Sequence, residues 1–150
     1  MEIVTHRYGR AEQAEVDAAD LFEFRPGLPG FERLTRYAIV PEEDSPVEWL
    51  QSLEDPGLAF AMIEPFLFYP EFGFELTDGD CEALGLREAQ DAVVRCLLTL
   101  NGAVEDITAN LLAPIVMNRT TGLARQVVLA DGNLSTRFPL LQTLRLPLSA

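Results

Sequence analysis

The side chains that most often carry catalysis or bind metals are few in this sequence and stand apart. His6 is its one histidine, and Cys81 and Cys96 are its two cysteines. Zinc sites and catalytic triads place histidine beside cysteine or carboxylate partners at defined spacings, and none of these spacings surrounds the three residues. We therefore expect a strand-surface histidine, two buried or indifferent thiols, no metal site and no bound cofactor.

The carboxylates are more numerous, but their spacing indicates no acid-base site. Glu42-Glu43-Asp44 and Glu54-Asp55 stand in turn-like, solvated contexts that do not raise a carboxyl pKa. The segment starting at Asp78 imitates a calcium loop, except that alanine stands at positions 83 and 89, where glycine and a bidentate glutamate are required. The sequence also lacks GxSxG, HExxH, GxGxxG and Walker motifs. We predict that the protein is not an enzyme.

The net charge is the most informative bulk property. The 150 residues include 24 acidic and 11 basic side chains, giving a formal net charge of −13, and all 11 basic side chains are arginine. Such a chain repels phosphate backbones, so direct nucleic-acid binding is disfavoured, whereas a basic protein partner would be attracted. Solubility alone is the simpler explanation of the same charge.

Length and hydropathy predict one domain in the cytoplasm. No stretch approaches the roughly 18 uninterrupted apolar residues of a membrane-spanning helix. The N-terminal segment lacks the basic and apolar regions of a signal peptide. We therefore expect a cytoplasmic protein that does not bind membranes.

The longest periodic stretch runs from Ile107 to Met117, where every second residue is apolar. A period of two over eleven residues predicts a strand with one face in a core. A turn at 118–122 and the β-branched run Gln126–Leu129 complete a predicted hairpin. Pro114 cannot donate to a ladder, so it should mark a bulge or a sheet edge.

Shorter runs predict further strands between proline and glycine turns. The predicted strands are Glu2–Tyr8, Leu21–Phe24, Arg36–Val40, Trp49–Leu53, Leu58–Ile63, Ala92–Leu100 and a short piece at Ser135–Leu140. Together they predict a mainly β fold: a small antiparallel β-barrel-like single domain over residues 1–140, with one or two short helices. Residues 141–150 form a leucine-containing tail that either docks on the barrel or frays.

The connections carry specific turn and helix signals. Thr77 as N-cap and Gly85 as terminator predict a short helix. Asn101-Gly102 predicts a two-residue hairpin into the strand that starts at Ile107. Pro-Gly pairs at 26–27 and 29–30 predict two consecutive turns, which form either a rigid corner or a contact loop.

One aromatic segment has two interpretations. Glu64–Phe72 holds four of the twelve Phe and Tyr residues of the chain, and it includes two prolines, at positions 65 and 70. Such a density is typical of a core, but the prolines restrict regular pairing and leave room for an exposed recognition patch.

Several stretches, taken in order, resemble one family, the bacterial flagellar assembly factor FliW. No single stretch is diagnostic, but five in register make the resemblance specific. Written with x for positions that do not match, they are Phe24-x-Pro26-Gly27-Leu28-Pro29-Gly30-Phe31, Leu50-Gln51-Ser52-x-x-Asp55-Pro56-x-x-Ala59-Phe60, Pro65-Phe66-x-Phe68, Asn110-Leu111-x-Ala113-Pro114-Ile115-Val116-x-Asn118 and Gln126-Val127-Val128-Leu129. One departure from the family pattern is the segment 9–16, which we expect to be a linker that is longer than usual.

The resemblance implies a small β-barrel-like fold without catalytic activity. It further implies that the protein binds flagellin in the cytoplasm. When flagellin is exported, the freed protein would bind the translational regulator CsrA and relieve repression of flagellin mRNA. The alternative function is that of a small β-barrel protein that binds a flavin or a nucleotide. This alternative predicts a deep pocket with convergent polar groups.

The polar residues of the matching stretches either contact a partner or hold turns and strand ends. They are Gln51, Ser52, Asp55, Asn110 and Asn118. The residues that we expect to be exposed and to bind a partner are Asp55, Phe68, Tyr69 and Asn118.

Overall fold

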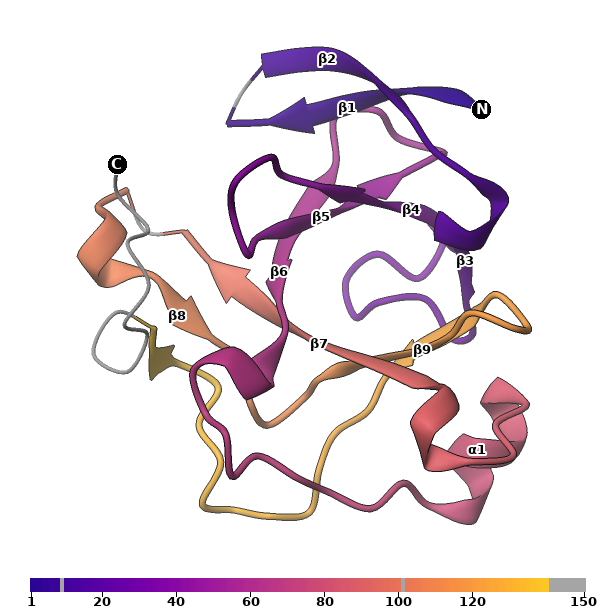
Figure 1. Cartoon of the computed structure of the whole chain (residues 1–150), viewed down its shortest axis with the longest axis vertical. Helices are drawn as coiled ribbons and strands as arrows, with labels where there is room; N and C mark the ends of the chain where they lie inside the picture. The colour runs from indigo at the N-terminus through magenta and orange to yellow at the C-terminus, as the bar shows by residue number, and fades with distance from the viewer. Residues whose placement is uncertain (9, 101, 141–150) are drawn as a thin grey trace.

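The computed structural model of the chain describes residues 1–8, 10–100 and 102–140 and shows a closed β-barrel with one short helix (Figure 1). The strands are β1 (Glu2–Arg7), β2 (Arg10–Glu15), β3 (Leu21–Phe24), β4 (Arg36–Pro41), β5 (Glu48–Ser52), β6 (Ala59–Ile63), β7 (Ala92–Thr99), β8 (Thr108–Ala109), β9 (Ile115–Asn118), β10 (Leu123–Gln126) and β11 (Phe138–Pro139). Within the described ranges the helices are α1 (Asp78–Leu84) and 3₁₀ turns at Ala18–Asp20, Pro65–Leu67, Ala89–Asp91 and Val104–Asp106.

Seven of the described strands close the barrel. Their order is β7-β6-β5-β4-β3-β10-β9, and β9 closes the ring by pairing with β7, where Val93 lies opposite Met117. Neighbours in the ring are antiparallel except β10 and β3, which run parallel. The predicted mainly β, barrel-like fold with a short helix is confirmed. The parallel pair is the exception to the antiparallel prediction, because β3 and β10 are far apart in the chain and no hairpin joins them.

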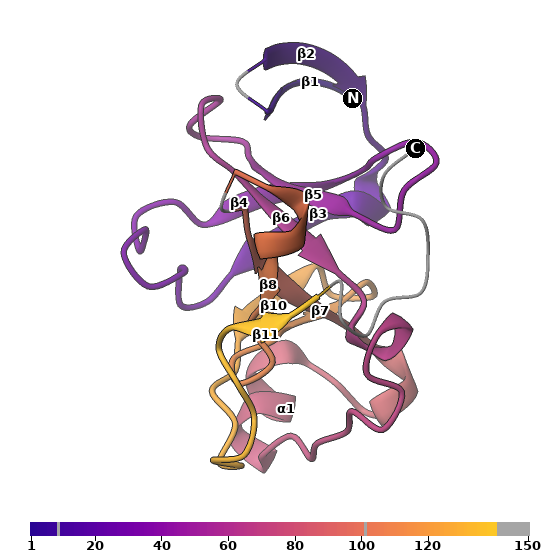
Figure 2. The same ribbon diagram turned by 90° about the vertical axis from the view of Figure 1, so that its left-hand side faces the viewer.

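The first two strands form a separate hairpin that lies over the barrel, at the top of Figures 1 and 2. Ile3 and Thr5 on β1 are buried toward the barrel, whereas β2 is largely exposed. The segment 9–16 was expected to be a linker, and this expectation is wrong for Arg10–Glu15. The sequence of β2 is polar with two alanines and shows no apolar alternation, so only its backbone pairing with β1 makes it a strand.

The predicted eleven-residue strand Ile107–Met117 is divided in two. β8 pairs with the end of β7 and with β11, whereas β9 pairs with the start of β7 and with β10. The Asn110 side chain accepts a hydrogen bond from Ala113 N at 3.0 Å and turns the chain between the two strands. The apolar alternation is still buried, because the interrupted backbone stays against the core.

The hairpin that follows is confirmed with a shifted register. β9 pairs with β10, Asn118 lying opposite Leu123, so the second strand begins before Gln126. Beyond β10, Val127 and Leu129 donate backbone hydrogen bonds to Pro114 O and Leu112 O. The predicted run Gln126–Leu129 therefore stays bonded to the segment before β9, although it is not part of the regular ladder.

The short helix is also confirmed. The Thr77 hydroxyl accepts from Asp80 N at 3.1 Å, and Gly85 ends α1 with φ of 68°, a conformation that favours glycine. The predicted hairpin at Asn101-Gly102 is wrong as a two-residue connection, because Thr99 pairs with Thr108 and the 3₁₀ turn Val104–Asp106 lies between them. Asn101 itself and the tail 141–150 lie outside the described residues.

The barrel interior is filled by side chains. Phe22, Phe24, Leu50, Met62 and Met117 all pack there and are buried. The ring of Tyr37 meets that of Phe24 edge to face, with centroids 5.1 Å apart. A small barrel filled in this way has no room for a ligand in its centre.

Tyr37 carries a stability prediction, because none of the described residues gives its buried hydroxyl a hydrogen bond. We expect Tyr37→Phe to raise the free energy of unfolding by about 1 kcal/mol, since it removes an unpaired buried polar group. Burial, with the charge of Glu54, raises the pKa of Tyr37 from its ordinary value of 10.0 to about 12. Because the unfolded tyrosine ionises at a lower pH than the folded one, the free energy of unfolding of the parent falls as the pH rises from about 10 toward 12. Tyr37→Phe has no hydroxyl to ionise at this position and should not show this fall.

Urea denaturation near pH 8 and near pH 11, followed by the fluorescence of Trp49, the single tryptophan, measures both effects. A variant that is less stable than the parent at both pH values would show that the hydroxyl has a hydrogen-bond partner after all.

Candidate protein-binding surface

The four predicted partner-binding residues occupy different environments. Phe68 is 3% exposed and Asn118 is 2% exposed, so the expectation that they lie on the surface is wrong. Asp55 is exposed at the β5–β6 turn, and Tyr69 is half-buried. Phe68 and Tyr69 lie together, since both rings pack against Phe138 with centroids 5.8 and 5.5 Å away. The structure does not bring the four into one surface.

The matching polar residues around β5 hold the backbone. Gln51 is fully buried, and its Oε1 accepts from His6 N at 2.7 Å, which fixes β1 to β5. Its Nε2 donates to the carbonyl oxygens of Ser52, Pro56 and Leu58 at 3.0 to 3.2 Å. Gln51 therefore joins the N-terminal hairpin and the β5–β6 turn to the barrel.

Ser52 and Asp55 act in the same turn. The Ser52 hydroxyl accepts from the backbone N–H groups of Glu54 and Asp55, and the Asp55 carboxylate accepts from Gly57 N at 3.0 Å. The carboxylate of Glu54 accepts from two more backbone N–H groups, and these bonds lower the pKa of Glu54. The interpretation of these residues as turn-holding groups is confirmed.

Asn118 holds α1 against the barrel. Its Nδ2 donates to Leu84 O at 2.9 Å, and its Oδ1 accepts from Thr120 N at 3.0 Å. The Thr121 hydroxyl donates to the same Leu84 carbonyl at 2.9 Å. The end of α1 is thereby fixed to the β9–β10 turn.

A second connection holds the start of α1. Arg125 on β10 donates through Nη1 to Asp80 Oδ1 at 2.8 Å. The same guanidinium donates through Nε and Nη2 to Arg25 O at 3.2 and 3.1 Å. α1 is therefore joined to β10 at its start and to the β9–β10 turn at its end.

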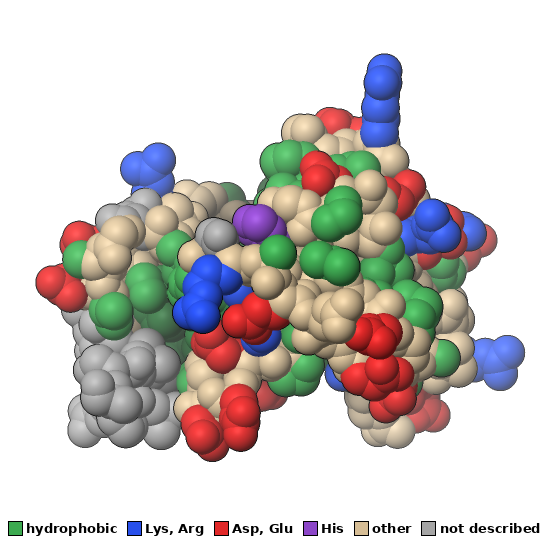
Figure 3. All heavy atoms as spheres, turned by 90° about the horizontal axis from the view of Figure 1, so that it is seen from above, with side chains coloured by type: hydrophobic (Ala, Val, Ile, Leu, Met, Phe, Trp, Pro, Cys, Tyr) green, Lys and Arg blue, Asp and Glu red, His purple; other side chains and the backbone are tan. Residues whose placement is uncertain are grey.

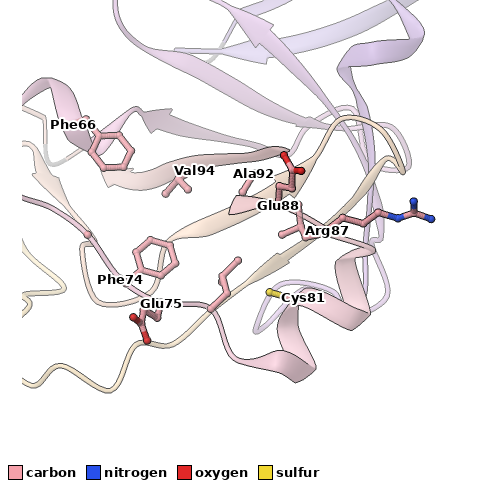
Figure 4. A pocket seen from close by; sticks show the side chains of 11 residues that line it. Phe66, Phe74, Glu75, Cys81, Arg87, Glu88, Ala92 and Val94 are labelled. Carbon is pink, nitrogen blue, oxygen red and sulfur yellow. The ribbon is translucent and has the colours of Figure 1, made fainter. Parts of the chain in front are cut away.

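This placement creates an apolar groove of about 460 Å³ between β7 and the segment that leads into α1, which we call the α1 groove (Figure 4). Its lining is mostly apolar and includes Phe66, Phe74, Leu76, Cys81, Leu86, Ala92 and Val94. The charged side chains Glu75, Arg87 and Glu88 also line it. Figure 4 shows the two phenylalanine rings and Val94 on one side, while the Arg87 guanidinium points away from them.

Two consecutive apolar side chains are exposed here, and the first of them, Phe66, lines the α1 groove. Phe66 and Leu67 are both large and exposed, and the Phe66 ring lies 5.9 Å from that of buried Phe72. Both interpretations of the aromatic segment therefore hold in part, since Phe68 and Phe72 are core and Phe66 is surface. The sequence did not predict the groove. The one local feature that pointed to exposed apolar surface here was the density of aromatic residues in Glu64–Phe72.

A second apolar groove, of about 400 Å³, lies at the other end of β7, and we call it the β8 groove. Its lining includes Tyr8, Glu42, Val47, Ala61, Leu98, Leu100, Val104, Ile107 and Leu140. The Tyr8 ring packs edge to face on Trp49, with centroids 5.1 Å apart, and its hydroxyl lies 3.3 Å from Glu42 Oε2.

The potentially reactive groups stand apart from one another. Burial raises the pKa of the Cys96 thiol to about 12, so this cysteine is a core residue with little thiolate at neutral pH. Asp80, from the calcium-like segment, is paired with Arg125 instead. Among the described residues no three His, Cys, Asp or Glu side chains are grouped as metal ligands.

The surface carries the acidic charge of the chain in several places. Seen from the β1–β2 side, acidic side chains gather in several groups, with arginine side chains among them and hydrophobic side chains between (Figure 3). Over the described part of the chain, no helix has the length and apolar character needed to cross a membrane.

Comparison with known proteins identifies the family. The model of the FliW protein family matches residues 2–140. The flagellar assembly factor FliW of Bacillus licheniformis is 39% identical over 139 residues, covering 92% of this chain and 96% of that protein. The FliW of Geobacillus sp. strain WCH70 is 37% identical over 140 residues, covering 93% and 95%.

A solved structure agrees with this assignment. The crystal structure of a flagellar assembly factor FliW superposes with a TM-score of 0.82 at 34% identity, covering 93% of this chain and 96% of that one. The residues that the family model matches, 2–140, include the barrel, the N-terminal hairpin and α1. This chain belongs to the FliW family of flagellar assembly factors.

Proposed function

We propose that this chain acts by binding proteins and not by catalysis. It binds flagellin in the cytoplasm and, once flagellin is exported, binds and antagonises a CsrA-type translational regulator, relieving repression of flagellin mRNA translation. The observation that carries the proposal is membership of the FliW family over residues 2–140. The relatives are named as flagellar assembly factors, and the two partners are what we propose for this chain.

The net charge supports a basic partner. A translational regulator that binds RNA presents a basic surface, and a chain with a formal net charge of −13 attracts such a surface. Once bound, the acidic protein would also repel the phosphate backbone of the mRNA, because like charges at short range oppose each other. The affinity of the regulator for RNA falls as a consequence, without any shared contact residue.

The α1 groove supports binding of a segment with one apolar face. Its lining is mostly apolar, and its charged side chains are two acidic ones, Glu75 and Glu88, and one basic one, Arg87. A flagellin segment that presents apolar side chains in a row, flanked by basic residues, matches this arrangement. Phe66 and Leu67 would be buried by such a segment, and large exposed apolar side chains commonly supply most of the binding energy.

The rival function, binding of a flavin or nucleotide, is not favoured by any observation. The barrel centre is filled by the core, and the α1 groove lacks the convergent polar groups that would orient a cofactor.

The double substitution Phe66→Ala with Leu67→Ala tests the proposal. We expect it to weaken binding of purified flagellin about tenfold, because both side chains lose the contact area that the partner would cover. Isothermal titration of the full chain against flagellin and, separately, against the CsrA-type regulator measures both affinities. Circular dichroism checks that the barrel remains folded.

Val128→Ala is the matched control, since Val128 is also exposed and lies outside both grooves. It should leave both affinities unchanged. If the parent chain binds neither protein, the proposed function is wrong. If the parent binds flagellin and the double variant binds it equally well, the α1 groove is not the contact surface.

A further inference from the structure

The β8 groove combines exposed apolar side chains from three segments of the chain. Leu100, directly after β7, is 44% exposed, and Val104, in the 3₁₀ turn before β8, is 40% exposed. Tyr8, directly after β1, is 64% exposed. Large exposed apolar side chains that share one concave surface are typical of a surface that binds another protein.

The charges around the β8 groove are acidic, and they come from two connections. Glu42 is the one charged side chain among the described residues that line the groove. The residues that follow it, Glu43 and Asp44, are exposed in the same connection. The second connection holds Glu105 and Asp106, in the 3₁₀ turn whose first residue lines the groove. An apolar surface with acidic residues beside it is complementary to a surface that is apolar and basic.

Two arginines lie near this surface without reversing its charge. Arg7 and Arg10 line a neighbouring recess together with three acidic residues, Glu12, Glu42 and Glu43. Arg7 pairs with Glu12, with Nη2 and Oε2 2.8 Å apart, so the charge of Arg7 is compensated within the chain. The acidic charge beside the β8 groove therefore exceeds the basic charge.

We propose that the β8 groove binds a basic protein surface that also presents apolar side chains. The inference rests on the proposed function, in which the CsrA-type regulator is the basic partner, and it places that regulator at the β8 groove. The α1 groove suits a basic partner less well, because Arg87 is among its lining residues, and it is left for flagellin.

The positions of the two grooves, at opposite ends of β7 (Figure 1), would make the two partners exclude each other. Val94 lines the α1 groove and Leu98 lines the β8 groove. They are four residues apart on β7, so they share the face opposite Val93 and Leu97, which pack against the barrel core. At roughly 3.3 Å per residue they are about 13 Å apart. A small folded domain is about 30 Å across, so partners seated in both grooves would collide without sharing a contact residue.

The double substitution Leu100→Ala with Val104→Ala in the full chain tests the apolar part of the proposal. We expect it to weaken binding of the purified CsrA-type regulator about tenfold and to leave the affinity for flagellin unchanged. Val4→Ala with Val128→Ala is the matched control, because both positions are exposed and apolar and line neither groove. The control should keep both affinities at the parent value. Isothermal titration measures the affinities, and circular dichroism checks the fold.

A second pair of variants tests the charge. Glu42→Gln with Glu105→Gln removes two carboxylates beside the β8 groove. Glu71→Gln with Glu82→Gln removes two exposed carboxylates that line neither groove, so both variants change the net charge equally. We expect the association rate with the regulator at low salt, measured by surface plasmon resonance, to fall several-fold in the first variant and to change little in the second, because charges near the contact steer association most strongly.

The outcomes separate this inference from the proposed function. If the parent chain binds flagellin but no regulator, the proposed regulator is wrong and the inference is wrong with it. If the parent binds the regulator and Leu100→Ala with Val104→Ala binds it equally well, the β8 groove is not the site, although the proposed function stands. In sedimentation of all three proteins together we expect two binary complexes, and a ternary complex would overturn the exclusion across β7.

Discussion

Replacing Gln51 with leucine is expected to lower the free energy of unfolding by about 3 kcal/mol, because it leaves buried polar backbone groups without partners. The His6 N–H loses its acceptor at 2.7 Å, and the Ser52 carbonyl loses a donor at 3.0 Å. Leucine has a similar volume, so the loss reports hydrogen bonding and not a cavity. The N-terminal hairpin should detach first, since the His6 contact is lost.

Urea denaturation followed by Trp49 fluorescence measures the total loss, and amide hydrogen exchange locates it. Exchange of the β1 and β2 amides should accelerate more than that of β9 and β10. Gln13→Leu is the matched control, because it replaces the same residue type by leucine at an exposed position of β2. It should change the free energy of unfolding by less than about 0.5 kcal/mol. If the two variants are equally stable, the buried amide is not what fixes the hairpin.

Arg125→Met should lower the free energy of unfolding by about 2 kcal/mol, the second largest effect that we expect. The substitution keeps most of the aliphatic stem but removes the ion pair with Asp80 and both hydrogen bonds to the Arg25 carbonyl. The two charged side chains are only 24% and 16% exposed, so solvent screens the pair less than a surface pair. Loss of the pair should also loosen α1 and the α1 groove beside it.

A double-mutant cycle with Asp80→Asn separates the ion pair from the bonds to the carbonyl. The coupling between Arg125 and Asp80 should be about 1 kcal/mol, and the rest of the Arg125 effect should persist in the Asp80→Asn background. Arg33→Met is the control for removing an arginine charge, since Arg33 is exposed. A coupling near zero would show that the contact with Asp80 contributes nothing, and an equal loss in the control would attribute the effect to net charge.

Local signals in the sequence predicted the elements that depend on local physics. Thr77 and Gly85 defined α1, because an N-cap hydroxyl and a left-handed glycine act within one turn. The strand β7 was found because its apolar residues alternate along the chain. β4 was found as a short run that ends at Pro41, and its four central residues are all buried, so both of its faces are covered. The same patterns predicted a barrel, and the matching stretches indicated the family.

The prediction failed where pairing, and not side-chain pattern, makes the strand. β2 has no apolar alternation, and its partner β1 alone defines it. The stretch Ile107–Met117 alternates throughout, yet its two ends pair with different strands, so the chain leaves the ladder between them. Phe68 and Asn118 were expected at the surface because a motif identifies residue types and not the direction of their side chains.

The fold class, the family, the acidic charge and the lack of a catalytic motif could all be inferred before folding was considered, since each depends on composition or on order along the chain. Which polar residues hold turns, and where apolar surface remains open, depends on how the chain folds. Both grooves are built from segments far apart in the chain, such as Tyr8 with Leu100 or Phe66 with Val94. Such surfaces arise from contacts between segments that are distant in the sequence, and no local pattern encodes these contacts.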